Sequence, residues 1–478
     1  MVVGQIEDPL DFVVVGAGPG GYATALRAAQ LGRKVTLIDR DGADGIGGVC
    51  LRVGCIPSKA LIEAAELAQR TRDAANMGID ATLNAIDMPR IQKWKGEIVS
   101  GLTDGVRMLL KQADVEIAAG DFHFTGAKAG VIATKDGQPR FVRFEDLVLA
   151  TGSRPVTLAD LPVNDKTICD STGALALDHV PKTMAVIGGG YIGLEIGTAF
   201  TKLGAAVTIV EAESRVLPTM DAHLTRPVAR RLKALGVEVK LGTRALAHSR
   251  GKLAISNGKN ETKIPAEVVV IAIGRRPNTD NLGLDLTNLR SDETGLLTVA
   301  DDRRVARHIA AIGDITPGRA LAHKATAEAQ VAAEALCGRN TAFVAGSVPA
   351  VVFSDPEIAT VGLSEAEAKA EGMEPLAARF PLAASGRGRT INASEGFVEI
   401  ISDKADERVL GVHIVGPHAS ELIAEGAVAV EMGASLEDVA LTIHPHPTLS
   451  EQVAEAAHVA LGRPIHISTP KNRKTSKS

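Results

Sequence analysis

The chain has 478 residues, of which 45% are hydrophobic and 23% charged, and its formal net charge is -5 at neutral pH. This length suits three or four domains of about 150 residues each, and no apolar run approaches the roughly 20 residues that cross a bilayer. The sequence therefore argues against a membrane protein and against general binding to nucleic acid, although residues 471–478 form a small basic tail that we expect to be disordered.

Cysteine usage indicates a reducing compartment. The chain holds four cysteines, too few for a secreted disulfide scaffold, and residues 1–10 show no charged-then-apolar leader. We therefore expect a cytoplasmic protein. Two of the cysteines, Cys50 and Cys55, stand five positions apart in a glycine-rich segment.

The first predicted strand leads into a nucleotide-binding motif. Residues 12–15 are a short apolar run, as in a buried parallel strand, and a helix is expected over 22–31. Between them stand the glycines of a G-x-G-x-x-G motif: Gly16, Gly18 and Gly21. These permit a tight turn, close approach of a pyrophosphate and close helix packing, while Asp39 after the next strand would hold ribose hydroxyls. An ordinary strand-to-helix turn is the alternative, but the flanking elements favour a dinucleotide site.

The same pattern recurs in the middle of the chain. An apolar run over 184–187 precedes a second set of glycines: Gly188, Gly190 and Gly193. A carboxylate follows the first glycine by 23 residues in both copies, from Gly16 to Asp39 and from Gly188 to Glu211. We therefore expect two dinucleotides. Glu211 would repel a 2′-phosphate, so the second site should prefer NAD to NADP.

Three further apolar strands end in glycine and belong to the same architecture. They close at Thr151-Gly152, at Gly274 and at Gly313-Asp314. Asp314 is well placed to bind a polar part of a cofactor, with a simple turn aspartate as the alternative. We expect an α/β fold with two Rossmann-like domains, the first over 1–152 and 283–347 and the second inserted over 153–282.

The pattern of predicted helices and strands changes after residue 347. A helix after Ser364, a strand pair over 397–401 and 409–415, and helices over 419–432 and 449–460 predict an α+β domain over 348–470. Near its end stand His444, His446 and Glu451.

The pair Cys50 and Cys55 has three explanations. Zinc binding is disfavoured because Cys169 and Cys337 are isolated, so we expect no metal. Two structural thiols are the second explanation. A redox-active disulfide explains the setting better, since Cys55 stands just before a predicted helix whose amino terminus stabilises a thiolate, and Lys59 adds positive charge.

Several motifs together resemble one family. They are Gly16-x-Gly18-x-x-Gly21, the two-cysteine segment 48–59, Ala150-Thr151-Gly152, the segment 188–193, Gly313-Asp314 and the segment 444–451. The chain is similar over nearly its whole length to class I pyridine nucleotide-disulfide oxidoreductases, and most to those that oxidise dihydrolipoyl groups. The resemblance implies FAD in the first site, NAD in the second, and a homodimer in which the carboxy-terminal domain of one subunit completes the active site of the other.

The resemblance also implies the catalytic roles. Cys50 would exchange with the substrate dithiol and Cys55 would contact the flavin. His446 of the other subunit would be the general base, oriented by Glu451. A histidine titrates near neutral pH and suits this task. The partner would be a lipoyl-bearing protein of a 2-oxo acid dehydrogenase or glycine cleavage complex, because no lipoyl domain precedes residue 12.

Two roles at the cofactors follow from the same resemblance. Lys59 would lie near the flavin and pair with Glu195, and Tyr191 would cover the nicotinamide pocket. Tyr191 could instead be a core aromatic residue, whereas Glu195 on an apolar helix needs a partner.

Some assignments have alternatives. Thr448-x-x-Glu451 also matches a helix capping box, a role that can coexist with the favoured catalytic one, and His444 is the alternative to His446 as the base. The family typically has Thr and Asn where this chain has Val49 and Arg52, which affects redox tuning and substrate preference. Another NAD(P)H-dependent disulfide reductase, or a weakened flavoprotein subunit docking on a multienzyme complex, would share most of these motifs.

Overall fold

The computed structural model describes residues 7–134, 137–164, 166–344 and 346–468, so the predicted basic tail lies outside the described residues. The chain forms two compact units. Unit 1 comprises Met1–Ala212 and Val239–Val344, and unit 2 comprises Glu213–Glu238 and Ala345–Ser478. In the part of the chain that was described, no helix combines the length and apolarity that crossing a bilayer requires.

The first sheet of unit 1 is built around a buried central strand. Its order is β17-β18-β6-β1-β2-β3, with β4 and β5 attached beside β6. The strands are β1 (Asp8–Val15), β2 (Val35–Asp39), β3 (Glu116–Ala119), β4 (Asp121–Gly126), β5 (Ala129–Ala133), β6 (Arg140–Leu149), β17 (Arg304–Ala306) and β18 (Ile309–Ala311). β1 runs parallel to β2 and β6. Phe12 and Val14 enter one apolar cluster and Val13 and Val15 another, so both faces of β1 are covered, as a continuous apolar run predicts.

The second parallel sheet repeats this plan. Its order is β11-β10-β9-β15-β8. The strands are β8 (Ile168–Asp170), β9 (Thr183–Ile187), β10 (Ala206–Val210), β11 (Glu238–Lys240) and β15 (Val268–Ile271). Two small antiparallel sheets complete unit 1: β12 (Arg244–Ser249) with β13 (Lys252–Ser256) and β14 (Glu261–Pro265), and β7 (Ser153–Pro155) with β16 (Arg275–Pro277). The predicted α/β fold with two Rossmann-like sheets is confirmed.

The two glycine turns are built alike, because an equivalent backbone carbonyl oxygen approaches the first glycine of each turn. Gly16 has φ +101°, and a Cβ there would lie 2.3 Å from the Ala150 carbonyl oxygen. Gly188 has φ +106°, and its Cβ would lie 2.4 Å from the Ala272 carbonyl oxygen. Each turn therefore requires glycine for both its backbone angle and its space.

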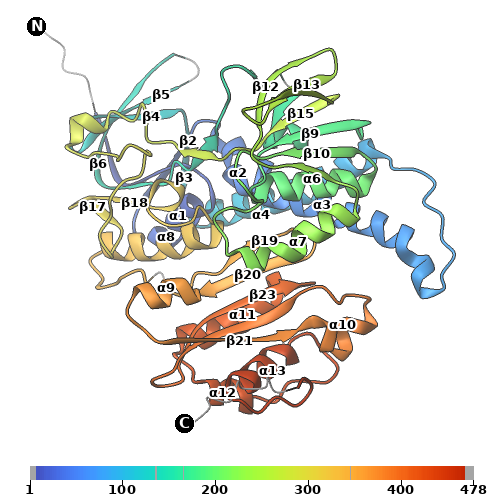
Figure 1. The fold of residues 1–478 in the computed structure, drawn as a ribbon. Coiled ribbons are helices and arrows are strands. Elements are labelled where there is room, and N and C mark those ends of the chain that lie inside the picture. Colours follow the sequence, from blue (N-terminus) through green and yellow to red (C-terminus); the bar gives the residue numbers. More distant parts are fainter. Residues whose placement is uncertain (1–6, 135–136, 165, 345, 469–478) are drawn as a thin grey trace, which may run out of the picture. The chain divides into compact units, whose positions relative to one another are not determined.

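Helices connect these strands. Those of unit 1 are α1 (Pro19–Gln30), α2 (Gly48–Val53), α3 (Cys55–Asp73), α4 (Met88–Gln112), α5 (Ser171–Leu175), α6 (Tyr191–Leu203) and α8 (Ala322–Leu336). Short 3-10 turns occur at Gly42–Gly45, Ala74–Met77, Leu284–Thr287 and Gly313–Ile315. α1 and α6 each follow a glycine turn, and α3 packs against α6, which brings the cysteine segment beside the second nucleotide motif (Figure 1).

Unit 2 is an antiparallel sheet covered by helices (Figure 1). The strand order is β19-β20-β23-β22-β21. Its strands are β19 (Ala350–Val352), β20 (Glu357–Gly362), β21 (Pro375–Pro381), β22 (Phe397–Asp403) and β23 (Val409–Gly416). The helices are α7 (Ala222–Ala234), α9 (Glu365–Ala370), α10 (Gly386–Thr390), α11 (Ala419–Glu431), α12 (Leu436–Leu441) and α13 (Glu451–Ala460), with a 3-10 turn at Leu382–Ala384.

The predicted elements of unit 2 agree with this arrangement. β22 and β23 pair antiparallel over the residues predicted to form a strand pair. Ser364 is the N-cap of α9 and forms a complete capping box with Glu367. α11 lies on β20 and β23, and α13 lies on β21 and β22. Val398, Ile400 and Val412 point into the core beneath these helices, so Glu399 and His413 face the other side of the sheet.

Candidate active site

A cavity of about 680 Å³ in unit 1 gathers most of the predicted site. It lies at the carboxyl ends of β1, β2 and β6 and along α2, α3 and α6. Eleven predicted residues line it: Gly16, Gly18, Asp39, Cys50, Cys55, Lys59, Thr151, Gly152, Tyr191, Glu195 and Asp314. The ends of parallel strands are where this fold binds its ligands. Motifs that are up to about 300 residues apart in the sequence therefore meet in one place.

The cysteine pair is brought to this cavity by glycines. Cys50 lies within α2 and Cys55 is the first residue of α3. Gly48 has φ +54°, and a Cβ there would lie 2.6 Å from the Cα of Gly18. The start of α2 therefore touches the first glycine turn, and the approach requires glycine at position 48.

The two thiols differ in acidity. Cys50 and Cys55 are not joined by a disulfide in the structure, and their side chains interact with each other. The hydrogen bond from Cys50 and, against burial, the charge of Lys59 lower the pKa of Cys55 to about 7. The same hydrogen bond, burial and the charge of Cys55 raise the pKa of Cys50. Cys55 is therefore the sulfur that ionises near neutral pH.

An ion pair joins α3 to α6 beside this sulfur. Lys59 Nζ donates to Glu195 Oε2 at 2.8 Å, and the Glu195 side chain is buried. A buried carboxylate without a cation would be costly, so Lys59 accounts for the presence of Glu195 on the apolar helix α6. Tyr191, the first residue of α6, is exposed and lines the cavity, which argues against a core role.

The two carboxylates that are predicted to hold ribose accept hydrogen bonds from the backbone of their glycine turns. Asp39 Oδ2 accepts the amide of Ala17 at 2.9 Å, and Glu211 Oε2 accepts the amide of Gly189 at 2.5 Å. The two copies therefore share geometry as well as spacing. Gly188, Gly190, Gly193 and Glu211 belong to the second turn, and Gly274 follows β15 of the same sheet.

The residues present fit two dinucleotides. Gly18 and Gly190 are the N-caps of α1 and α6, and no side chain of the described residues caps either helix. A Cβ at Gly190 would meet nothing within 4 Å, and one at Gly18 would meet only the Gly48 Cα at 3.9 Å. Uncapped amides facing open space are what a pyrophosphate needs.

A buried network that the sequence analysis did not identify holds Asp314. Ser153 Oγ donates to Asp314 Oδ2 at 2.5 Å. The adjacent amide of Gly313 donates to Glu328 Oε2 at 2.7 Å, and Glu328 is fully buried with Lys324 Nζ 3.1 Å away. In the sequence, Glu328 could have been identified as a carboxylate within an alanine-rich, apolar helix, which needs a partner.

His446 and Glu451 lie in unit 2 and contact each other. His446 Nδ1 lies 2.9 Å from Glu451 Oε2, and the His446 side chain is 74% exposed. The amide of Glu451 also donates to Thr448 Oγ1 at 3.3 Å. The helix-start contact and the histidine contact therefore coexist.

His444 is engaged differently. Its side chain is only 7% exposed, Nδ1 lies 2.8 Å from the Thr442 carbonyl oxygen, and Nε2 lies 2.7 Å from Glu425 Oε1. Both ring nitrogens are occupied, so His444 is poorly suited to accept a substrate proton. His446 is the better candidate base.

The two departures from the family pattern lie on α2. Val49 is exposed, and both Val49 and Arg52 line the cavity. Arg52 Nη1 lies 3.8 Å from Asp41 Oδ2, two residues beyond Asp39. The guanidinium of Arg52 therefore points towards the segment that follows β2.

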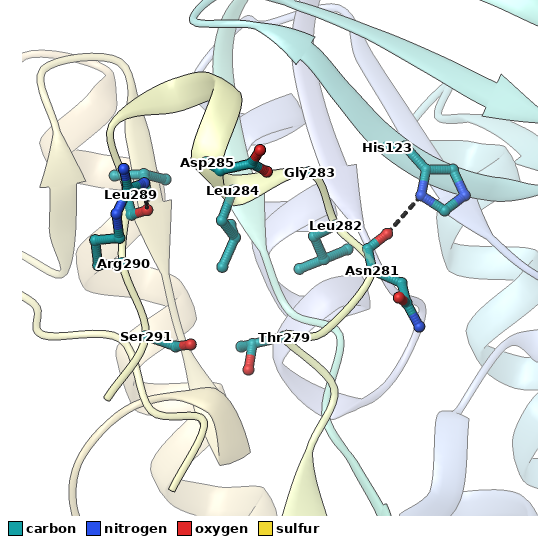
Figure 2. A pocket seen from close by; sticks show the side chains of 10 residues that line it. All are labelled: His123, Thr279, Asn281, Leu282, Gly283, Leu284, Asp285, Leu289, Arg290 and Ser291. Atoms are coloured by element: carbon teal, nitrogen blue, oxygen red, sulfur yellow. Dashed lines mark hydrogen bonds between the residues drawn. The ribbon is translucent and has the colours of Figure 1, made fainter. Parts of the chain in front are cut away.

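A second cavity, of about 930 Å³, adjoins the first (Figure 2). Its lining shares His123, Asn281 and Leu282 with the cofactor cavity. His123 Nδ1 donates to the Asn281 carbonyl oxygen at 2.5 Å, as Figure 2 shows. None of the described residues that line it is a predicted catalytic residue.

Known proteins resemble this chain over nearly its whole length. The pyridine nucleotide-disulphide oxidoreductase family matches residues 10–329, and its dimerisation domain matches residues 348–457. The dihydrolipoyl dehydrogenase of Geobacillus stearothermophilus is 46% identical over 476 residues, covering 98% of this chain and 100% of the relative. That of Bacillus subtilis is 43% identical over 474 residues, with 98% and 100% covered.

Solved structures show the same likeness. LpdA from Mycobacterium tuberculosis superposes with a TM-score of 0.87 at 28% identity, covering 94% of this chain and 99% of that one. The HOCl-induced flavoprotein disulfide reductase RclA from Escherichia coli superposes with a TM-score of 0.81 at 25% identity, with 94% and 99% covered.

Proposed function

Because the chain belongs to the pyridine nucleotide-disulphide oxidoreductase family, we propose that it is a dihydrolipoyl dehydrogenase that uses FAD and NAD. The observation that carries this proposal is the thiol pair in the cofactor cavity. Cys55, whose pKa is lowered to about 7 chiefly by its interaction with Cys50, lines the same cavity as Cys50 and the first glycine turn. A dithiol beside a flavin site can exchange electrons with an external disulfide or dithiol.

Two successive disulfide exchanges transfer two electrons from the substrate to the cysteine pair. In the oxidised enzyme Cys50 and Cys55 form a disulfide, and a substrate thiolate attacks Cys50, breaking that bond and releasing Cys55 as a thiolate. The second substrate thiol then displaces Cys50, so the substrate leaves as a cyclic disulfide and the enzyme keeps two electrons. When bound, FAD would supply the two-electron acceptor for Cys55 and the hydride that reduces NAD.

Side chains of the protein accept the proton of the substrate and stabilise the thiolate. His446, held through Nδ1 by Glu451, leaves Nε2 to accept the proton of the substrate thiol. The charge of Lys59 stabilises the Cys55 thiolate before electrons leave it. The buried Glu211 at the second turn would repel a 2′-phosphate, which supports NAD over NADP.

The partners follow from the same assignment. The match to a dimerisation domain supports a homodimer in which His446 serves the cysteines of the other subunit. We also propose a lipoyl-bearing protein of a 2-oxo acid dehydrogenase or glycine cleavage complex as the substrate, and the cytoplasm as the location. FAD would bind residues 1–152 and 283–347, NAD residues 153–282, and the dimer contacts would come from residues 348–470.

Replacement of the exchange thiol tests the function. Cys50→Ser should retain FAD, because Cys55 and the glycine turns are intact. The rate of NAD-dependent dihydrolipoamide oxidation should fall at least about 10³-fold, because the substrate thiolate has no disulfide sulfur at position 50 to attack. Turnover with dihydrolipoamide above that level in the variant would contradict the proposal.

Comparison of substrates separates the alternatives. With NADH under anaerobic conditions, the wild-type enzyme should develop long-wavelength thiolate-to-flavin absorbance and reduce lipoamide far faster than glutathione disulfide. Faster glutathione turnover would indicate another disulfide reductase. A flavin that reduces without the long-wavelength band would indicate the weakened docking subunit.

A further inference from the structure

A cluster of two histidines and a glutamate lies in unit 2, on the sheet face opposite its main apolar core. Glu399 of β22 and His413 of β23 are direct cross-strand neighbours, and His223 comes from α7. The His413 and Glu399 side chains are 4% and 3% exposed, and that of His223 is 25% exposed. The proposed reaction uses none of these residues.

The three side chains point their ligand atoms at one another. His223 Nε2 lies 2.9 Å and His413 Nδ1 lies 3.1 Å from Glu399 Oε2, and the three atoms lie within 4.8 Å of each other. Ligands about 2.0–2.2 Å from a metal with angles of roughly 90–110° are about 2.9–3.5 Å apart. The two nitrogen-to-oxygen separations therefore already suit coordination to one ion.

The surroundings hold the carboxylate in place. Arg379 Nε donates to Glu399 Oε1 at 2.5 Å, which leaves Oε2 directed at the two imidazoles. The Phe397 ring stacks on the His223 ring at 5.9 Å, and the Arg379 guanidinium lies 5.4 Å from the same Phe397 ring. Outer contacts of this kind orient ligands and are a regular feature of metal sites.

α7 is fastened to unit 2 by other contacts as well. Arg231 Nε lies 2.9 Å from Asp355 Oδ2, and Arg230 Nη2 lies 2.6 Å from Glu395 Oε2. His223 is therefore presented to Glu399 and His413 even before an ion binds, so the ligands are preorganised.

We propose that His223, Glu399 and His413 bind a divalent transition-metal ion, with Zn²⁺ favoured, as a structural clamp between α7 and the sheet. Two imidazole nitrogens and one carboxylate oxygen are a donor set that Zn²⁺ accepts, and the partly exposed side of His223 leaves room for a water as a further ligand. This proposal departs from the expectation of no metal that the sequence suggested. The proposal is independent of the dehydrogenase assignment.

Zinc binding to the intact holoenzyme tests the clamp. The FAD-loaded protein is stripped with a chelator and kept oxidised, so that Cys50 and Cys55 offer no thiolate, and is then titrated with ZnCl2 by calorimetry and metal analysis after gel filtration. We expect one tightly held zinc per chain. His223→Gln should weaken it by at least about 10- to 100-fold, because losing a ligand costs no less than losing an outer contact.

A matched histidine provides the control. His248 is also partly buried, but its Nε2 lies 2.8 Å from the Ala266 carbonyl oxygen, so His248→Gln should retain the zinc. In the unmodified chain, zinc should slow modification of His223 by diethyl pyrocarbonate and leave His248 unchanged, which locates the ion even if a variant does not fold. No retained zinc in the wild type, equal binding by His223→Gln, or no protection of His223 would overturn the proposal and leave a hydrogen-bonded clamp only.

Discussion

At the residue scale, the acidity of Cys55 depends on two opposite charges near its sulfur. The charge of Lys59 lowers the pKa of Cys55 and that of Glu195 raises it, although these two residues form an ion pair with each other. The hydrogen bond from Cys50 makes the largest contribution. Single replacements of the two partners should therefore move the titration of Cys55 in opposite directions.

We expect the thiolate-to-flavin absorbance of the reduced enzyme to appear as pH rises through about 7, the pKa of Cys55, because the thiol form below it cannot donate charge. Lys59→Met should shift this midpoint upwards, towards the ordinary pKa of 9.0, and Glu195→Gln should shift it downwards. An anaerobic pH titration of the reduced holoenzyme measures both. Shifts of the same sign would show that the variants act by disturbing α3 and α6 instead of by charge.

Arg52 lies between Cys50 and Cys55 in the sequence, but in the structure its side chain is directed towards Asp41 and not towards the two sulfurs. Its nearest ion-pair partner is Asp41, beyond the end of β2. Arg52→Asn should therefore weaken FAD binding by about threefold to tenfold in a salt-dependent manner, as an exposed charge contact worth about 1 kcal/mol would. The pH midpoint of the Cys55 titration should stay unchanged. Apoenzyme titration with FAD measures the first effect, and a moved midpoint would restore the redox-tuning interpretation.

At the scale of elements, the two glycine turns allow the two cofactors to be separated. A Cβ at Gly193 would lie 2.0 Å from the Gly188 carbonyl oxygen, and one at Gly21 would lie 1.7 Å from that of Gly16. Gly193→Ala should raise the KM for NAD while FAD stays bound, and Gly21→Ala should release FAD. Each change should also cost about 1–3 kcal/mol of folding stability through overpacking.

The same substitution in an open helix provides the control for this pair. A Cβ at Gly101, inside α4, would meet nothing within 4 Å, so Gly101→Ala should stabilise the chain by about 0.4–1 kcal/mol and leave both cofactors bound. Thermal unfolding and retained flavin absorbance after desalting distinguish the cases. Loss of both cofactors in Gly193→Ala would mean that the turns do not act separately.

Local patterns predict these turns because their requirements are local. The strand, glycines, helix and carboxylate of each copy lie within about 30 residues, and the backbone angle at Gly16 leaves little choice of residue. Glu328 under Gly313 and the cluster of His223, Glu399 and His413 depend on contacts between residues far apart in the sequence. No spacing rule connects such residues, so they become visible only when the sheets are assembled.

At the scale of the whole molecule, the proposed homodimer makes each active site depend on two chains. Cys50 belongs to unit 1 and His446 to unit 2. If the base comes from the other subunit, a dimer of one Cys50→Ser chain and one His446→Gln chain has one site that keeps both the wild-type cysteine pair and a wild-type histidine. If both came from the same chain, that mixed dimer would have no complete site.

Two inactive variants should therefore restore activity when their subunits are exchanged. Random reassembly of equal amounts makes about half of the dimers mixed, each with one complete site of two, so about one quarter of wild-type dihydrolipoamide oxidation should return. Unmixed samples carried through the same unfolding and refolding are the controls, and FAD content normalises the rates. Activity that stays at the level of the single variants, despite mixed dimers detected by distinct affinity tags, would show that His446 serves its own chain.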